Sequence, residues 1–179
     1  MTQVCLVGTE DVNLRYELLS RETARNALAT YDLQEPFANT VAVDTVSLGA
    51  AVALLNDLNW YLVRFADAAF IRDPSISETE WLSRNLAASI RDDDVMPADT
   101  GRFLKVYGIV ESNRASDADD EATSEKESTP DTQATEAGGP PELVEPMLLT
   151  RTGDTIPEYD LQDVDETLIV RVTESEFGA

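Results

Sequence analysis

The chain of 179 residues is long enough for one ordinary domain whose core needs neither disulfides nor a metal. It has 35 acidic residues against 13 basic ones, a net charge of -22, and such a field disfavours binding to the phosphates of DNA or RNA. The chain contains no histidine and one cysteine, Cys5, which excludes histidine-based catalysis, CxxC redox motifs and the usual structural zinc sites.

The acidity is spread over the chain. Residues 112–141 account for -6 of the net charge, so most of it lies elsewhere, and only Lys105 and Lys126 among the basic residues are lysines. An acidic surface with scarce lysine predicts a protein of a halophile, since molar salt shortens the Debye length to about 3 Å and screens self-repulsion. An acidic tail that docks on a basic partner is the competing interpretation.

The first elements are short. Residues 3–8, QVCLVG, form an apolar run ending in glycine and predict a buried strand. Apolar and charged residues alternate over residues 12–19, which favours a second strand, and a helix running on from Leu14 is the alternative. Ser20 is a good N-cap, and apolar residues at helical spacing over residues 21–31 predict a helix after it.

Residues 41–65 are the stretch around which the rest of the chain is organised. Residues 41–46 predict a strand, and Ser47 caps a helix with an apolar inner face. Residues 60–65 are apolar on both faces apart from Arg64, which is typical of a central strand. The spacing between the two strands suits a parallel crossover, so we predict one right-handed βαβ unit over residues 41–65.

Further elements follow in the second half. Ser77 and Glu80 have the spacing of a capping box, which predicts a helix over residues 78–91. The apolar run over residues 102–110 predicts a strand.

A change of composition separates these elements from the last two strands. Residues 112–141 contain no Val, Ile, Leu, Met or aromatic residue, and this predicts a disordered acidic insert. Residues 146–151 predict a strand that pairs with residues 102–110 as a hairpin, and residues 166–173 predict the last strand.

The predicted fold class is α+β, with α/β as the alternative. We expect a single mixed sheet of about six to eight strands with three helices, which includes the βαβ unit. Residues 1–111 and 142–179 together form one globular domain, and residues 112–141 are its insert.

Motifs for chemistry are scarce. The sequence has neither a phosphate-loop pattern nor a nucleophile elbow, and VCLVG followed by TED offers one glycine where a dinucleotide fingerprint has three. Arg15 and Arg64 interrupt strand-like apolar runs. Such an arginine points to solvent or, if buried, needs a carboxylate or an anionic ligand. With Asn13, these two arginines are the candidate ligand-binding residues, and residues 9–15 are the place for an anion.

A second group of candidates lies at the end of the central helix. Asn56, Asn59 and Trp60 are candidate partner-binding residues, a polar rim beside an aromatic surface, although helix termination explains the asparagines more simply. The acidic clusters at residues 92–94 and 160–166 lack the spacing and glycine of a calcium loop. We therefore predict no metal, no other cofactor and no catalytic residue.

Two stretches, VCLVG-TEDVNLRYELLSRETARNALA and VSLGAAVALLNDLNWYLVRF, resemble a family of small acidic uncharacterised proteins from haloarchaea. The resemblance covers most of the chain outside the acidic insert. It implies a haloarchaeal source and a cytoplasmic location, and it carries no catalytic motif.

Two functional hypotheses follow. The first is a non-enzymatic cytoplasmic protein that acts as an interaction, accessory or regulatory module, with a protein partner or with further copies of itself. The alternative is a small-molecule or nucleotide-binding protein, or an enzyme, with an arginine-held anion near residues 9–15. The N-terminus lacks a signal-peptide pattern, and no apolar run approaches the ~18–20 residues of a membrane helix. We therefore expect no membrane association.

Overall fold

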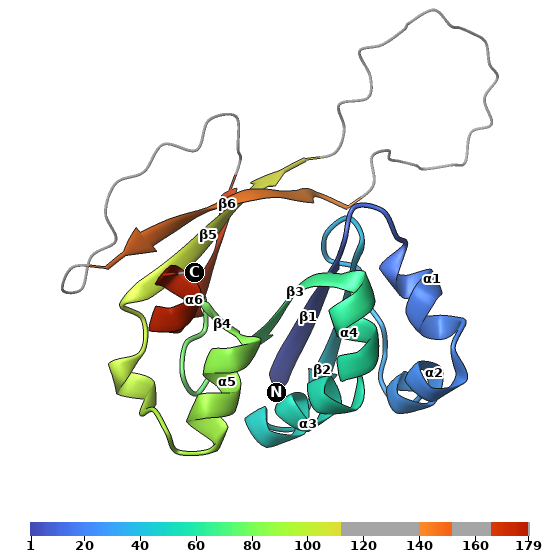
Figure 1. Ribbon diagram of the computed structural model, residues 1–179, viewed down its shortest axis with the longest axis horizontal. Coiled ribbons are helices and arrows are strands. Elements are labelled where there is room, and N and C mark those ends of the chain that lie inside the picture. Colours follow the sequence, from blue (N-terminus) through green and yellow to red (C-terminus); the bar gives the residue numbers. More distant parts are fainter. Residues whose placement is uncertain (112–139, 152–165, 179) are drawn as a thin grey trace, which may run out of the picture.

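The computed structural model describes residues 1–111, 140–151 and 166–178. They form an α+β fold in which one mixed sheet of seven strands curls, with helices packed mainly on one side (Figure 1). Most of the predicted insert, residues 112–139, and the acidic cluster at residues 160–165 lie outside the described part, so those predictions are not tested.

The strand order of the sheet is β2-β1-β3-β4-β7-β5-β6. All neighbouring strands are antiparallel except β4 and β7, which are parallel. The strand bounds are β1 Thr2–Gly8, β2 Thr40–Thr45, β3 Ala66–Arg72, β4 Trp81–Ser83, β5 Phe103–Val110, β6 Glu142–Thr150 and β7 Glu166–Val172.

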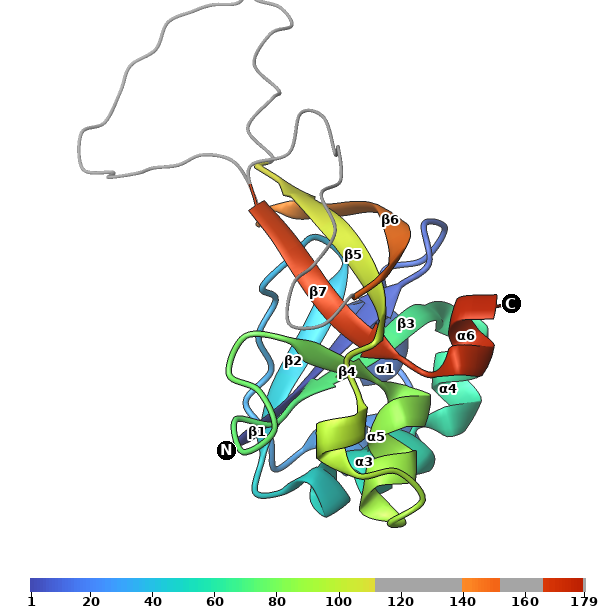
Figure 2. The same ribbon diagram turned by 90° about the vertical axis from the view of Figure 1, so that its left-hand side faces the viewer.

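Six α-helices and one 3₁₀ turn lie in the described ranges. Their bounds are α1 Leu14–Leu19, α2 Glu22–Leu28, α3 Leu48–Asp57, α4 Asn59–Phe65, α5 Arg84–Arg91, α6 Glu174–Gly178 and the 3₁₀ turn Pro97–Asp99. Helices α3 and α5 lie on one side of β1–β4, while β5 and β6 extend away from them (Figure 2).

The sheet is buried on both faces in its first half. Val4 and Leu6 of β1 pack with helices α1–α5, and Cys5 between them packs with Phe70 and Tyr107 in a second cluster on the opposite face. This alternation follows the two-residue period of a strand. Strand β1 is therefore the centre of the fold's first half, and residues 41–65, which were expected to be central, pack around it.

The two edges of the curled sheet approach each other. Ala38, in the loop before β2, donates its backbone N–H to the carbonyl of Pro141, directly before β6 (2.7 Å). Edge strands β2 and β6 are thus linked at one end, and the apolar second cluster lies inside the curl.

The prediction of a βαβ unit over residues 41–65 is wrong for its second strand. Residues 59–65 form helix α4, and the strand that follows is β3. Strands β2 and β3 are parallel to each other, but β1 lies between them and pairs with both. The run of apolar residues also fits a helix, of which Leu62 is the buried residue, and the central place in the sheet is taken by β1.

Two other assignments differ. Residues 14–19 form helix α1 and not a strand, because Asn13 accepts the N–H of Tyr16 and caps a helix there (3.0 Å). Ser77 accepts the N–H of Glu80 as the capping box predicts, yet no helix starts there. Residues 81–83 form β4 instead, and the helix begins after them.

The helix predicted over residues 21–31 is present as α2, but the cap predicted at Ser20 is wrong. Ser20 ends α1, and Arg21 precedes α2 without a capping side-chain hydrogen bond. The remaining assignments are confirmed. The first strand, the strand after residue 40, the helix capped by Ser47, the β5–β6 hairpin and the last strand are all present. The expected three helices are too few, because the sequence reading missed α1, α4 and the short C-terminal α6.

Candidate functional site

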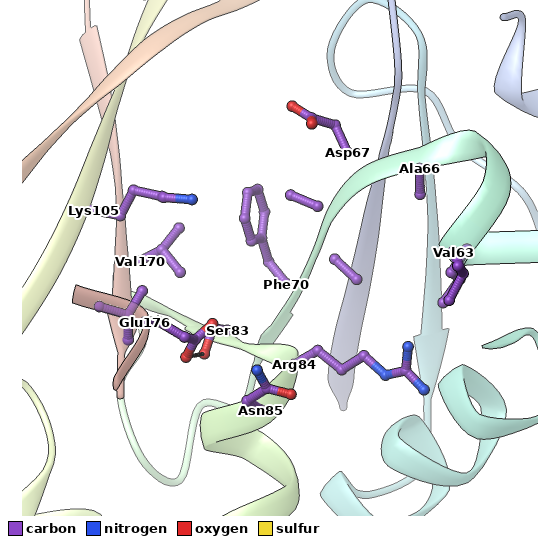
Figure 3. A pocket seen from close by; sticks show the side chains of 14 residues that line it. Val63, Ala66, Asp67, Phe70, Ser83, Arg84, Asn85, Lys105, Val170 and Glu176 are labelled. Atoms are coloured by element: carbon purple, nitrogen blue, oxygen red, sulfur yellow. Dashed lines mark hydrogen bonds between the residues drawn. The ribbon is translucent and has the colours of Figure 1, made fainter. Parts of the chain in front are cut away.

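The sheet is interrupted beside β3. Strand β4 has three residues and pairs with β3 only at Phe70 and Ile71. The first four residues of β3, Ala66–Ala69, therefore have no strand neighbour on that side within the described residues. A cavity of about 250 Å³ lies at this interruption (Figure 3).

Seven elements build the cavity wall: α4, β3, β4, α5, β5, β7 and α6. The lining residues are Leu62, Val63, Ala66, Asp67, Ala68, Ala69, Phe70, Ser83, Arg84, Asn85, Lys105, Val170, Val172 and Glu176. The wall thus combines an apolar floor with charged side chains of both signs, which is the usual composition of a small-molecule site.

Glu176 anchors one end of the wall. Its Oε2 accepts hydrogen bonds from the Ser83 hydroxyl (2.7 Å) and from the backbone N–H of Thr173 (2.9 Å), and Thr173 Oγ1 accepts the N–H of Glu176. This is a reciprocal capping box that starts α6. Ser83 also accepts the N–H of Leu86 and caps α5, so both side chains are committed to the scaffold.

The side chains of Lys105 and Asp67 have fewer contacts within the fold. Lys105 lies on β5 with its ammonium 5.9 Å from the Tyr107 ring centre, and neither it nor Asp67 has an ion pair or hydrogen bond within the described part of the chain. Burial raises the pKa of Tyr107 to about 12, and the negative charge of Asp67 adds to the rise.

A second surface lies next to the cavity, on the outer side of α4. Trp60 is 49% exposed and Val63 is 69% exposed. The guanidinium of Arg64 stacks 3.7 Å from the Trp60 ring centre and donates to the Trp60 carbonyl. Tryptophan and arginine are the residues most enriched among binding hot spots.

Arginines border this α4 surface on both sides. Arg21 lies 4.9 Å from the Phe65 ring centre and 6.0 Å from that of Trp60. On the other side, Arg84 donates to the side chain of Asn56 (3.3 Å). The α4 surface is thus a cationic and aromatic patch on a chain of net charge -22.

The predicted ligand-binding residues do not come together. Asn13 and Arg15 lie at the start of α1, whereas Arg64 lies on α4. Arg15 is exposed and its guanidinium is 3.2 Å from the carboxylate of Glu35. A carboxylate therefore already occupies the position that an anion would take.

The loop after β1 is filled by a residue that the sequence reading did not single out. Asn39 accepts the N–H of Leu14 through its side chain, donates to the carbonyl of Thr9 and accepts the N–H of Gly8. A Cβ at Gly8 would lie 2.7 Å from Asn39 Nδ2, which explains the glycine. The loop's polar groups thus serve the fold, and an anion near residues 9–15 stays an untested prediction.

The predicted partner residues lie closer together. Asn56 is near the end of α3, and Asn59 and Trp60 begin α4 directly after it. All three are exposed. Because α3 and α4 meet here, the structure places the predicted polar rim at one end of the α4 surface.

A partly buried ion cluster lies where β4 meets β7. Glu80 accepts from Arg171 Nε (2.7 Å) and from Arg151, and Arg171 also donates to Thr100. Burial would raise the pKa of Glu80, but the hydrogen bonds from Arg171 and Arg151 hold the pKa below its usual value. All three ionic side chains are at most 16% exposed, so this cluster joins the two halves of the sheet.

The single cysteine lies in the core. The Cys5 thiol is buried, and burial raises its pKa to about 12 despite the opposing charge of Arg72. A protonated buried thiol is a poor nucleophile. Within the described ranges no group of three His, Cys, Asp or Glu side chains is placed to hold a metal, and no helix is long and apolar enough to cross a membrane.

The comparisons with known proteins give a family and no function. Residues 2–109 match DUF5804, a family of unknown function. The chain belongs to this family. The matched part contains α4, Asp67 and Lys105, whereas Glu176 lies beyond it. No curated protein and no solved structure matches the chain.

Proposed function

We propose that the protein is a non-enzymatic interaction module of a halophile's cytoplasm, and that the α4 surface binds an acidic segment of a partner protein. The observation that carries the proposal is the half-exposed Trp60 with Arg64 stacked on it. A tryptophan left in water costs free energy that a partner's apolar groups would recover.

The charge around Trp60 supports an acidic partner. Arg64 lies on α4, and Arg21 lies beside Trp60 and Phe65 while it also pairs with Glu17. Arg84, the first residue of α5, lies beside Asn56. An acidic segment meets like charge on most of this protein and opposite charge on the α4 surface. Direct contact with the arginines therefore favours this place for such a partner, because charges more than about 3 Å apart are screened in molar salt.

The cellular setting rests on composition. A net charge of -22 and two lysines among 13 basic residues are typical of proteins that work in molar salt. In that medium exposed ion pairs weaken, while contacts between apolar groups and guanidinium stacking on rings persist. This favours Trp60 and Val63 as anchors, with the arginines setting the choice of partner.

A matched pair of variants tests the α4 surface. Val63 and Val46 are both exposed valines, at 69% and 81%, but only Val63 lies on α4. We expect a partner captured in molar potassium chloride from the cells that make the protein to be lost with Val63→Asp and kept with Val46→Asp. Native mass spectrometry would give the stoichiometry.

Two results would contradict the proposal. One is a strict monomer that captures no partner in molar salt. The other is equal capture by both aspartate variants, which would place the interface elsewhere.

A further inference from the structure

Unlike charges face each other across the cavity beside β3. Lys105 from β5 and Asp67 from the start of β3 extend from opposite walls toward the space over the Phe70 ring (Figure 3). They do not form an ion pair with each other, and no other described residue pairs with either. Both side chains line the cavity of about 250 Å³, which is the space for a ligand.

We propose that this cavity binds a small zwitterion of the amino-acid type. The ligand carboxylate lies at Lys105, its ammonium lies at Asp67, and its apolar side chain lies over Phe70. The cavity and the α4 surface share Val63 and Arg84, whereas Trp60 does not line the cavity.

The identity of the cation supports a binding role. Lysine is rare in this chain, where 11 of 13 basic residues are arginine, and Lys105 is the one lysine among the described residues. Arginine satisfies the fold's own carboxylates, as Arg151 and Arg171 do at Glu80. A lysine ammonium is a compact point charge that accepts a single carboxylate without the planar fork of a guanidinium.

The floor and the size narrow the ligand class. Phe70 is 2% exposed, and Val170 and Val172 continue the apolar floor. Ligand pockets usually measure about 300–1,000 Å³, so a cavity of about 250 Å³ suits a small metabolite and is too small for a nucleotide. A short aliphatic side chain matches the floor.

The second charge argues against a simple anion site. Asp67 would repel an anion held at Lys105, whereas the ammonium of a zwitterion would pair with it.

Three probes with the same apolar body test the inference. They are L-valine, isovalerate, which lacks the amine, and isobutylamine, which lacks the carboxylate. Calorimetric titration of the full chain in molar potassium chloride should show L-valine binding about tenfold or more tighter than either analogue, because each analogue leaves one charge unpaired.

Two variants assign the ends of the ligand. Lys105→Met should weaken L-valine binding about tenfold or more and leave isobutylamine unchanged, since methionine keeps the apolar stem. Asp67→Asn should weaken L-valine and isobutylamine and leave isovalerate unchanged or tighter. Arg102→Met, an exposed cation at the start of the same strand, is the control for Lys105→Met, and melting curves check that each variant folds.

The outcomes are distinct. Equal binding of isovalerate and L-valine would show an anion site and overturn the proposal. Failure of glycine, L-alanine, L-valine and L-leucine all to bind would overturn it as well. Trp60→Ala should leave the L-valine affinity unchanged, so failure here and failure of the α4 surface are separable.

Discussion

Two arginine clusters in this molecule have opposite surroundings. At the junction of β4 and β7, Arg151 and Arg171 are 16% and 14% exposed and share the carboxylate of Glu80. On α4, Arg64 is exposed and stacks on a half-exposed tryptophan. The arginines of the first cluster donate hydrogen bonds to Glu80 within the fold, whereas the guanidinium of Arg64 faces solvent and is accessible to another molecule.

The contrast separates arginines that stabilise the fold from arginines that are accessible to a partner. The charge of an arginine that is paired with a partly buried carboxylate is already balanced within the fold, and removal of that carboxylate leaves the charge with little access to water. An arginine held by a ring keeps its edge in solvent. We first expect effects of removing the Glu80 carboxylate from the first cluster, and then smaller effects of substitutions at the cavity wall and on α4.

The largest effect is expected for Glu80→Ala. This change leaves two buried guanidinium groups without their carboxylate, so we expect a loss of about 3–5 kcal/mol in the free energy of unfolding. Thermal melting in molar potassium chloride would measure it. The control is Glu35→Ala, which breaks the exposed pair with Arg15 and should cost at most about 1 kcal/mol. Equal losses would show that the buried cluster does not join the sheet halves.

The same cluster should control part of the acid sensitivity. The pKa of Glu80 in the folded state lies below its ordinary value of 4.5, so its contribution to stability is full above that pH and is lost as the pH falls through the folded pKa. We expect the stability gap between the wild type and Glu80→Gln to narrow as the pH falls below about 4.5. Denaturant titrations across this range would measure the gap, and a constant gap would contradict the prediction.

The fold could be predicted where local signals and tertiary pairing agree. Ser47 caps α3 as its sequence indicates, and β5, β6 and β7 follow runs of apolar and β-branched residues. At residues 60–65 the local pattern fits both a strand and a helix. The helix forms here because β1 already occupies the place between β2 and β3: its Cys5 pairs with Ala42 on one side and Phe70 on the other. No window around residues 60–65 contains that information.

The candidate sites show the same limit. Trp60 is a candidate already in the sequence, because an aromatic residue beside polar residues is visible there. Asp67 and Lys105 were not found, because they face each other only where the three-residue β4 leaves the sheet open. One missed signal was readable: Thr173 and Glu176 have the spacing of a capping box, and they start α6.

A middle-sized effect is expected for Ser83→Ala at the cavity wall. The change removes the N-cap of α5 and the hydrogen bond to Glu176, so we expect a loss of about 1–2 kcal/mol. Ser47→Ala is the matched control, because Ser47 caps α3 without a carboxylate partner and its loss should be the smaller one. Chemical denaturation would measure both. Equal losses would mean that the Glu176 contact adds nothing to stability.

The smallest effect is expected for Arg64→Ala. The stack on Trp60 is exposed, so its loss should cost less than about 1 kcal/mol. Because Trp81 is 6% exposed, the variant's change in tryptophan emission should come from Trp60 and shift to the red as its ring gains water. Arg64→Met, which retains an apolar stem over the ring, should shift less. A loss near that of Glu80→Ala would place Arg64 in the scaffold and remove the contrast between the two clusters.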